Sequence, residues 1–134
     1  MIVLDTDVVS DYLVGRPAAE SFLREHDSQR CAVSTVVAYE LMMGAVHGHL
    51  DGEPDSIRDG LTVAFDILPV DEQVTRAAVE LQSELLDVGA PAETQDALIA
   101  ATARHHGGQF ATNERTFWEP AVQSVLDVVE YNRD

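Results

Sequence analysis

The chain begins with the run Met1-Ile2-Val3-Leu4-Asp5-Thr6-Asp7, and the fold is best inferred by starting from this stretch. Four apolar residues in a row, ended by acids, predict a short buried strand. An acid at the end of such a run is unusual, because removing a carboxylate from water is costly unless something compensates its charge. Asp5 is therefore the first candidate for a functional side chain.

Three further acids lie at the edges of apolar segments, far apart in the chain. Glu40 lies inside an apolar run, Asp96 directly precedes one, and Glu114 follows another by three residues. If the fold brings these acids to Asp5, their charges need a compensating cation, and a divalent metal ion is the obvious one. Carboxylate oxygens favour Mg²⁺ or Mn²⁺ over zinc.

The bulk composition indicates one globular domain over residues 1–134. Apolar residues make up 46% of the chain, and there is a single cysteine, Cys31, which has no partner for an internal disulfide. The sequence shows no signal peptide and no apolar stretch long enough for a membrane span. We therefore expect a cytoplasmic protein with no membrane partner.

The charge balance is strongly acidic, with 24 Asp and Glu against 8 basic residues and a net charge of -16. All eight basic residues are arginine. Acidic excess without lysine favours a halophilic protein, adapted to a cytosol of very high salt; the plainer alternative is an acidic surface that maintains solubility. At about 1 M salt the Debye length falls to roughly 3 Å, so the net charge does not exclude a nucleic-acid partner.

Apolar periodicity, helix caps and Gly/Pro breakers predict alternating strands and helices. Strands are expected at residues 2–4, 31–33, 66–70, 109–111 and 125–129. Helices are expected at residues 7–14 and 17–26, and from Ser34 or Thr35 to about residues 44–48. A loop or helix connection at 49–58 is followed by a helix that ends at Phe65. Two further helices are expected from Asp71 to about residue 88 and at 93–106, and a short helical turn at 115–119. This alternation predicts an α/β fold with a mostly parallel sheet and helices on both faces.

This topology offers a common place for the four acids. Ligands of open α/β sheets bind beyond the carboxyl ends of the strands, where Asp5 and Glu114 are expected. Asp96 is expected in the first turn of its helix, where the helix dipole favours an anion, and that end of the helix reaches the same edge. Glu40 needs its helix to cross this edge. Each acid alone also has a plainer interpretation, as a helix cap, a surface residue or an exposed turn residue.

Five segments together resemble the PIN-domain ribonucleases, specifically VapC-type toxins. They are VLDTDVVSDYL (3–13), STVVAYELMMGA (34–45), LPVDEQVTRAAVELQSELLDVGAP (68–91), ETQDALIAATARHHG (93–107) and FATNERTF (110–117). The resemblance spans nearly the whole chain in order and spacing. It implies a three-layer α/β/α PIN-like fold with a mostly parallel central sheet.

By position, Asp5, Glu40 and Asp96 match the metal-binding acids of this family. The fourth acid departs from the pattern, because the family usually has Asp at the position of Glu114 or of Thr116. Glutamate is one methylene longer and retains the carboxylate, so Glu114 remains a candidate ligand, and we expect it to contact the metal through water. Asp7 stands where the family usually has Asn, which adds a negative charge two residues from Asp5.

The resemblance also implies residues that contact the substrate. Thr112 and Asn113 match small polar residues that line the pocket in relatives. Arg16 and Arg115 lie near the expected site loops and are candidates for phosphate contacts, although solvated loop arginines would show the same pattern.

The activity implied by the resemblance is Mg²⁺- or Mn²⁺-dependent endonucleolytic cleavage of RNA, with tRNA or ribosomal RNA as the expected substrate class. The implied partners are a cognate antitoxin, as in type II toxin–antitoxin pairs, and a second copy of the chain in a homodimer. One alternative is a PIN-fold RNA- or protein-binding module with a weakened site, because Asp7 and Glu114 depart from the family pattern.

A second alternative is a phosphatase of the haloacid-dehalogenase type, since Asp5-Thr6-Asp7 after a strand resembles its DxD start. That chemistry normally uses a lysine, and the chain has none. No Gly-rich nucleotide-binding motif follows any strand, which argues against a nucleotide cofactor.

Overall fold

The computed structural model describes all residues from 1 to 134 and contains a five-stranded sheet in which every pair of neighbours is parallel. The spatial order is β3-β2-β1-β4-β5. The strands are β1 (Ile2–Leu4), β2 (Cys31–Ser34), β3 (Asp66–Leu68), β4 (Gln109–Thr112) and β5 (Val128–Glu130). The expected α/β class with a parallel sheet is therefore confirmed.

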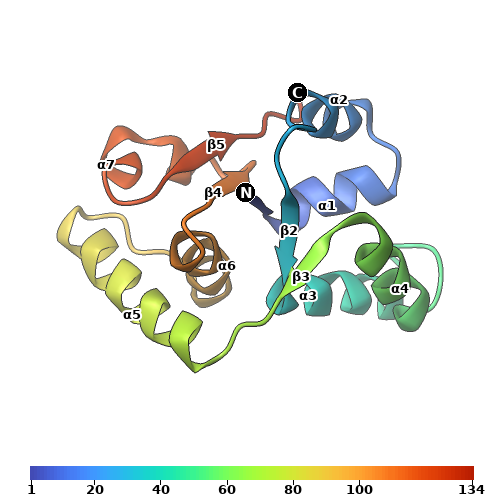
Figure 1. Cartoon of the computed structure of the whole chain (residues 1–134), viewed down its shortest axis with the longest axis horizontal. Helices are drawn as coiled ribbons and strands as arrows, with labels where there is room; N and C mark the ends of the chain where they lie inside the picture. The colour runs from blue at the N-terminus through green and yellow to red at the C-terminus, as the bar shows by residue number, and fades with distance from the viewer.

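Helices cover both faces of this sheet and give the three layers (Figure 1). In this view α5, α6 and α7 lie to the left of the sheet, and α1 to α4 lie to its right. The bounds are α1 (Thr6–Leu13), α2 (Pro17–Glu25), α3 (Thr35–Val46), α4 (Pro54–Ala64), α5 (Glu72–Asp87), α6 (Thr94–His105), the 3₁₀ helix η1 (Arg115–Trp118) and α7 (Pro120–Gln123).

The first strand lies at the centre of the core. Ile2, Val3 and Leu4 are each fully buried, because β1 has a neighbouring strand on both sides and helices on both faces. A strand in this position has no solvent face, which explains its unbroken apolar sequence. Asp5 directly follows β1, so the same run that fixes the centre of the sheet also places this carboxylate at its carboxyl edge.

Two helix starts agree with the caps expected from the sequence. The Ser34 hydroxyl accepts a hydrogen bond from the Val37 N–H, and the Asp71 carboxylate accepts one from the Val74 N–H. Each bond satisfies a backbone donor that the first turn of a helix leaves free. These caps fix where α3 and α5 leave the strands that precede them.

Two sequence-based expectations are wrong. The segment expected to connect helices over residues 49–58 is already helical from Pro54, because proline is well suited to the first helical position. The last strand begins at Val128 rather than Val125, and the short helix α7 precedes it. Leu126 is buried in the core from the turn between them, so its apolar character reflects packing rather than strand pairing.

The turn between α6 and β4 requires a glycine at position 108 for steric reasons. A Cβ at Gly108 would lie 2.8 Å from the backbone oxygen of Met1, which also accepts the hydrogen bond that starts the pairing of β1 and β4. The obstacle is backbone, so it has little freedom to move.

We therefore expect Gly108→Ala to lower the free energy of unfolding by about 2 kcal/mol, as overpacking against a fixed group does. Gly60→Ala is the matched control, because a Cβ at this position in α4 meets no atom within 4 Å. The control should be stabilising by about 0.5–1 kcal/mol, since alanine is the better helix former. Urea denaturation of the two variants measures both effects, and equal stabilities would contradict the packing argument.

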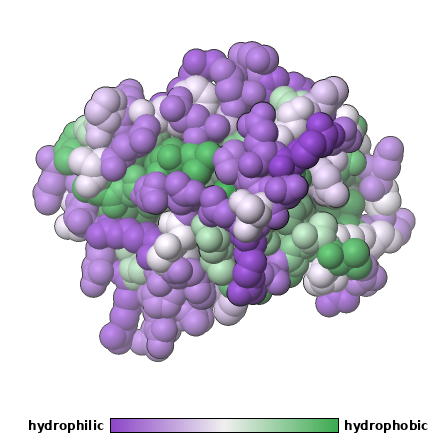
Figure 2. Space-filling model, turned by 45° about the horizontal axis from the view of Figure 1, so that its top comes forward, coloured by the Kyte–Doolittle hydropathy of each residue, from purple (hydrophilic) through white to green (hydrophobic).

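The surface reflects the acidic composition. Hydrophilic side chains cover most of the face in Figure 2, and smaller apolar groups lie between them. None of the helices combines the length and the apolar character that crossing a bilayer would require.

Candidate acidic site

Asp5 lies between β1 and α1 with both carboxylate oxygens held by the protein. Its Oδ1 accepts a hydrogen bond from the Thr6 N–H at 2.8 Å, and its Oδ2 accepts one from the Thr112 hydroxyl at 2.7 Å. The residue is only 8% exposed. Thr112 ends β4, the strand beside β1, so the orientation of Asp5 depends on the register of these two strands.

Burial raises the pKa of Asp5 to about 7. The hydrogen bonds from Thr112 and Thr6 act in the opposite direction, while the negative charges of Asp96 and Asp7 raise the pKa further. No arginine is among the groups that affect this carboxylate. Asp5 is therefore a buried acid among other acids, with no protein cation to neutralise it.

Asp96 lies in the first turn of α6 and is half-buried. Its pKa is raised first by burial and then by the negative charges of Glu114, Glu40, Glu93 and Asp7, in that order. Apart from Glu93, which caps α6 itself, these carboxylates come from other elements, so several segments of the chain bring an acid close to Asp96. Asp5, Glu40, Asp96 and Glu114 thus share one region, as the topology predicts.

Glu40 reaches this region from the middle of α3. The Thr6 hydroxyl donates a hydrogen bond to Glu40 Oε1 at 2.8 Å, which connects α3 to the start of α1. Thr6 therefore contacts two of the acids, through its N–H to Asp5 and through its hydroxyl to Glu40. Sequence reasoning did not assign a role to Thr6, and its position next to Asp5 was the only available signal.

Glu114 has a more peripheral position. It is exposed and caps η1, and its Oε1 accepts hydrogen bonds from the N–H and the hydroxyl of Thr116. Its own N–H donates to the Thr112 hydroxyl at 3.0 Å. Thr112 thus connects Glu114 to Asp5. Thr116, the other position considered for the fourth acid, instead donates hydrogen bonds to the Glu114 carboxylate and so holds it in place.

A hollow of about 440 Å³ opens beside Asp96 and Glu114. Glu93 and Thr116 add polar groups to its wall, and the remaining lining is mainly apolar, from Ala90, Pro91, Ala92, Phe117 and Val122. The site therefore combines carboxylates with room for a ligand at the carboxyl edge of the sheet.

The arrangement of the carboxylates can be compared with what a metal ion requires. No group of three or more His, Cys, Asp or Glu side chains is arranged to hold one ion. Mg²⁺ usually retains several waters and takes only one or two carboxylates directly, so a site of spaced carboxylates fits its chemistry. The uncompensated burial of Asp5 supports a cation at this place. The assignment of Asp5, Glu40, Asp96 and Glu114 as metal ligands stays a prediction.

Among the expected substrate-binding residues, Thr112 is fully buried, and its hydroxyl is hydrogen-bonded to Asp5 and to the Glu114 N–H. These bonds position the acids, and a contact of Thr112 with substrate stays a prediction. Asn113 follows it and is partly exposed. Asp7 is exposed, and its charge raises the pKa of Asp5 and of Asp96.

The two arginines expected near the site have partners within the protein. Arg16 Nε lies 3.5 Å from Asp11 Oδ1. Arg115 lies over the ring of Trp118, with 5.1 Å from its guanidinium carbon to the ring centre, and 3.6 Å from Asp134. Their role in phosphate binding stays a prediction, since both keep substantial exposure.

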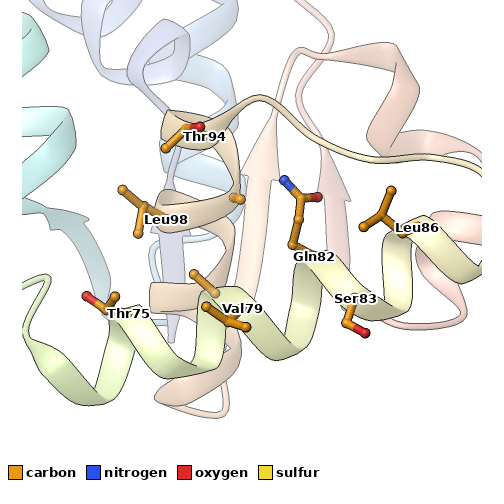
Figure 3. A pocket seen from close by; sticks show the side chains of 9 residues that line it. Thr75, Val79, Gln82, Ser83, Leu86, Thr94 and Leu98 are labelled. Atoms are coloured by element: carbon orange, nitrogen blue, oxygen red, sulfur yellow. The ribbon is translucent and has the colours of Figure 1, made fainter.

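A second hollow, of about 430 Å³, lies between α5 and α6 (Figure 3). Figure 3 shows Val79, Gln82 and Leu86 of α5 on one wall and Leu98 of α6 on the other. The lining is mostly apolar and contains no acid, base or nucleophile with an altered pKa. This hollow is separate from the acidic site and offers no comparable chemistry.

Comparison with known proteins agrees with the fold. A family model for the PIN domain matches residues 2–122. The chain is 30% identical to the plasmid stability protein StbB of Pseudomonas syringae pv. tomato, over 95% of this chain and 97% of that protein. The chain belongs to the PIN-domain family, which confirms the resemblance noted in the sequence.

Solved structures show the same fold. VapBC2 from Rickettsia felis, in complex with a DNA fragment from its promoter, superimposes with a TM-score of 0.78 at 22% identity, covering 98% of this chain and 100% of that one. A toxin–antitoxin complex from Klebsiella pneumoniae gives a TM-score of 0.73 at 25% identity and covers 96% of each chain.

Proposed function

We propose that the protein is a Mg²⁺- or Mn²⁺-dependent endoribonuclease that acts as the toxin of a type II toxin–antitoxin pair. The observation that carries this proposal is that Asp5 and Asp96 lie among other acids, and that none of Asp5, Glu40, Asp96 and Glu114 forms an ion pair with an arginine. Membership of the PIN family, whose members are generally nucleases, supports the reaction class. The cleaved substrate would be RNA, with tRNA or ribosomal RNA as the expected class.

The protein groups have distinct roles in this proposal. Asp5 and Asp96 would hold the metal ion, with Glu40 and Glu114 at its periphery. The ion would neutralise negative charge that develops on the phosphate during cleavage. Thr112 and the Thr6 N–H fix the Asp5 carboxylate, and the Thr6 hydroxyl fixes Glu40. These bonds hold the acids in place before a ligand arrives, which reduces the reorganisation needed for catalysis.

The proposed partners follow from the relatives. The Klebsiella pneumoniae structure is a toxin–antitoxin complex, which supports a cognate antitoxin for this chain. A homodimer and a cytoplasmic location are part of the same proposal. Sedimentation of the purified chain tests the dimer, and co-purification with the product of a neighbouring small gene tests the antitoxin.

Metal binding separates a nuclease from a binding module with a weakened site. We expect saturating Mg²⁺ or Mn²⁺ to raise the melting temperature of the wild type, because an ion that binds only the folded state stabilises it by mass action. Asp96→Asn should lose most of this increase. Asp59→Asn, an exposed acid on α4, is the control and should keep it. An unchanged wild-type melt would count against the nuclease proposal.

The activity itself is tested by incubating the purified protein with tRNA and ribosomal RNA, with Mn²⁺ or with EDTA. Cleavage at defined positions that EDTA abolishes is the expected result. Mapping RNA ends in cells after induced expression then identifies the target. RNA that stays intact with both metals would contradict the proposal.

The halophilic interpretation of the composition makes a separate prediction. Raising KCl from 0.1 to 2 M should increase the melting temperature by several degrees, because salt screens the repulsion among a net charge of -16. Thermal melts at matched pH measure this effect, with NaCl in a parallel series. A melting temperature that falls with salt would argue for an ordinary acidic surface.

A further inference from the structure

The acidic site does not account for a second buried carboxylate on α1, Asp11. Its side chain is only 7% exposed, and it accepts hydrogen bonds from residues at the end of the chain. The Tyr131 hydroxyl and Arg133 Nε donate to its Oδ2 at 2.8 and 3.0 Å, and Arg133 Nη2 donates to its Oδ1 at 3.0 Å. Figure 1 shows the C-terminus next to α2, which follows α1.

Two guanidinium groups share one oxygen of this carboxylate. Arg133 Nη2 and Arg16 Nε lie 3.0 and 3.5 Å from Asp11 Oδ1. Arginines held this close repel each other, and two carboxylates lie beside them, the buried Asp11 and the exposed Asp7 at 3.9 Å from Arg133 Nη2. The exposed sides of the two guanidinium groups remain open to an anion, and phosphate suits the planar fork of a guanidinium.

Arg133 also reaches the rim of the acidic site. Asp7 and Asp11 are four residues apart on α1, so they lie on the same face of this helix. Arg133 Nη2 is 3.9 Å from Asp7 Oδ1, and Asp7 is two residues from Asp5 in the sequence. The Arg133 side chain is 31% exposed, and its hydrogen bonds use Nε and Nη2, which leaves Nη1 free to donate.

We propose that Arg133, fixed by Asp11 and with Arg16 beside it, binds a backbone phosphate of the RNA at the rim of the acidic site. This inference rests on the proposed function and extends it. A chain with a net charge of -16 needs such a contact to hold RNA next to carboxylates. The two hydrogen bonds with Asp11 hold the guanidinium in place before binding, so little side-chain freedom is lost when phosphate arrives.

RNA binding as a function of salt tests this role. The probe is a fluorescently labelled tRNA preparation, and Asp96→Asn serves as the background so that the probe stays intact. We expect Arg133→Gln to weaken binding by about 10- to 100-fold, the loss of one charge-assisted hydrogen bond. The slope of log Kd against log salt should fall by about 0.7–1, the change for one lost phosphate contact.

The matched control is Arg76→Gln, an exposed arginine of α5 that pairs only with Glu72. Its affinity and salt slope should equal those of the background protein. Arg133→Lys keeps the charge but loses the fork, so it should recover part of the affinity and should fold even if Arg133→Gln does not. In the active protein, Arg133→Gln should raise KM with kcat unchanged.

The outcomes separate the inference from the proposed function. If the background protein binds tRNA and both Arg133 variants match it in affinity and slope, the phosphate contact is overturned while the nuclease proposal stands. If the wild type neither binds nor cleaves RNA, the proposed function fails and the inference fails with it. A loss of binding that has no change in salt slope would indicate a structural effect and would also overturn the contact.

Discussion

Asp5→Asn is expected to reduce RNA cleavage at least about a hundredfold, the scale on which single preorganised electrostatic groups contribute to catalysis. The carboxamide has nearly the shape of the carboxylate and can still accept a hydrogen bond from the Thr6 N–H. It carries no charge, so it is a poor ligand for Mg²⁺ or Mn²⁺. The loss should therefore be chemical rather than structural.

The measurement is the rate of RNA cleavage at saturating Mn²⁺, with purified wild type and variant. Asp59→Asn, the same chemical change at an exposed position of α4, should keep the wild-type rate. A circular-dichroism melt shows that both variants are folded. Cleavage by Asp5→Asn within a few-fold of wild type would remove Asp5 from the proposed machinery.

The second large effect concerns stability without metal. The pKa of Asp5 is about 7 in the folded protein against an ordinary value of 3.8. The folded state keeps this proton up to about pH 7, whereas the unfolded chain releases it from about pH 4. The contribution of this proton to the free energy of unfolding is complete below about pH 4. It is lost progressively as the pH rises from about 4 through 7.

In EDTA, this linkage should lower the free energy of unfolding by up to about 4 kcal/mol between pH 4 and pH 8. Asp5→Asn has no proton to lose, so its stability relative to wild type should rise across the same window and level off above pH 7. The variant should melt on the order of 10 °C above wild type at pH 8.

Thermal melts of wild type, Asp5→Asn and Asp59→Asn at pH 5, 6, 7 and 8 measure the effect. Asp59→Asn should follow the wild-type curve. If Asp5→Asn also parallels wild type at every pH, burial does not destabilise the Asp5 anion. Together with the cleavage assay, the melts show whether the residue that the reaction needs is also one that destabilises the metal-free fold.

Much of the fold follows from local signals in the sequence. The apolar run before Asp5 predicts a central strand, because a strand buried on both faces has no polar alternation. Ser34 and Asp71 predict the starts of α3 and α5, because a cap acts on a backbone N–H three residues away. The errors at Pro54 and at residues 125–129 occur where one pattern fits two structures, since proline starts helices as well as ending them.

The sequence by itself therefore determined the class of fold, the family and the arrival of four acids at one sheet edge. The tertiary structure decided how those acids are held and which residues accompany them. Asp5 and Thr112 are 107 residues apart, and Asp11 and Arg133 are 122 apart. Such contacts depend on strand register and on where the chain end packs, and neither is encoded by neighbouring residues. The hydrogen bonds of Thr112 with the acids and the contact of Arg133 with Asp11 were visible only in the tertiary structure, because burial and distance exist only once the chain is folded.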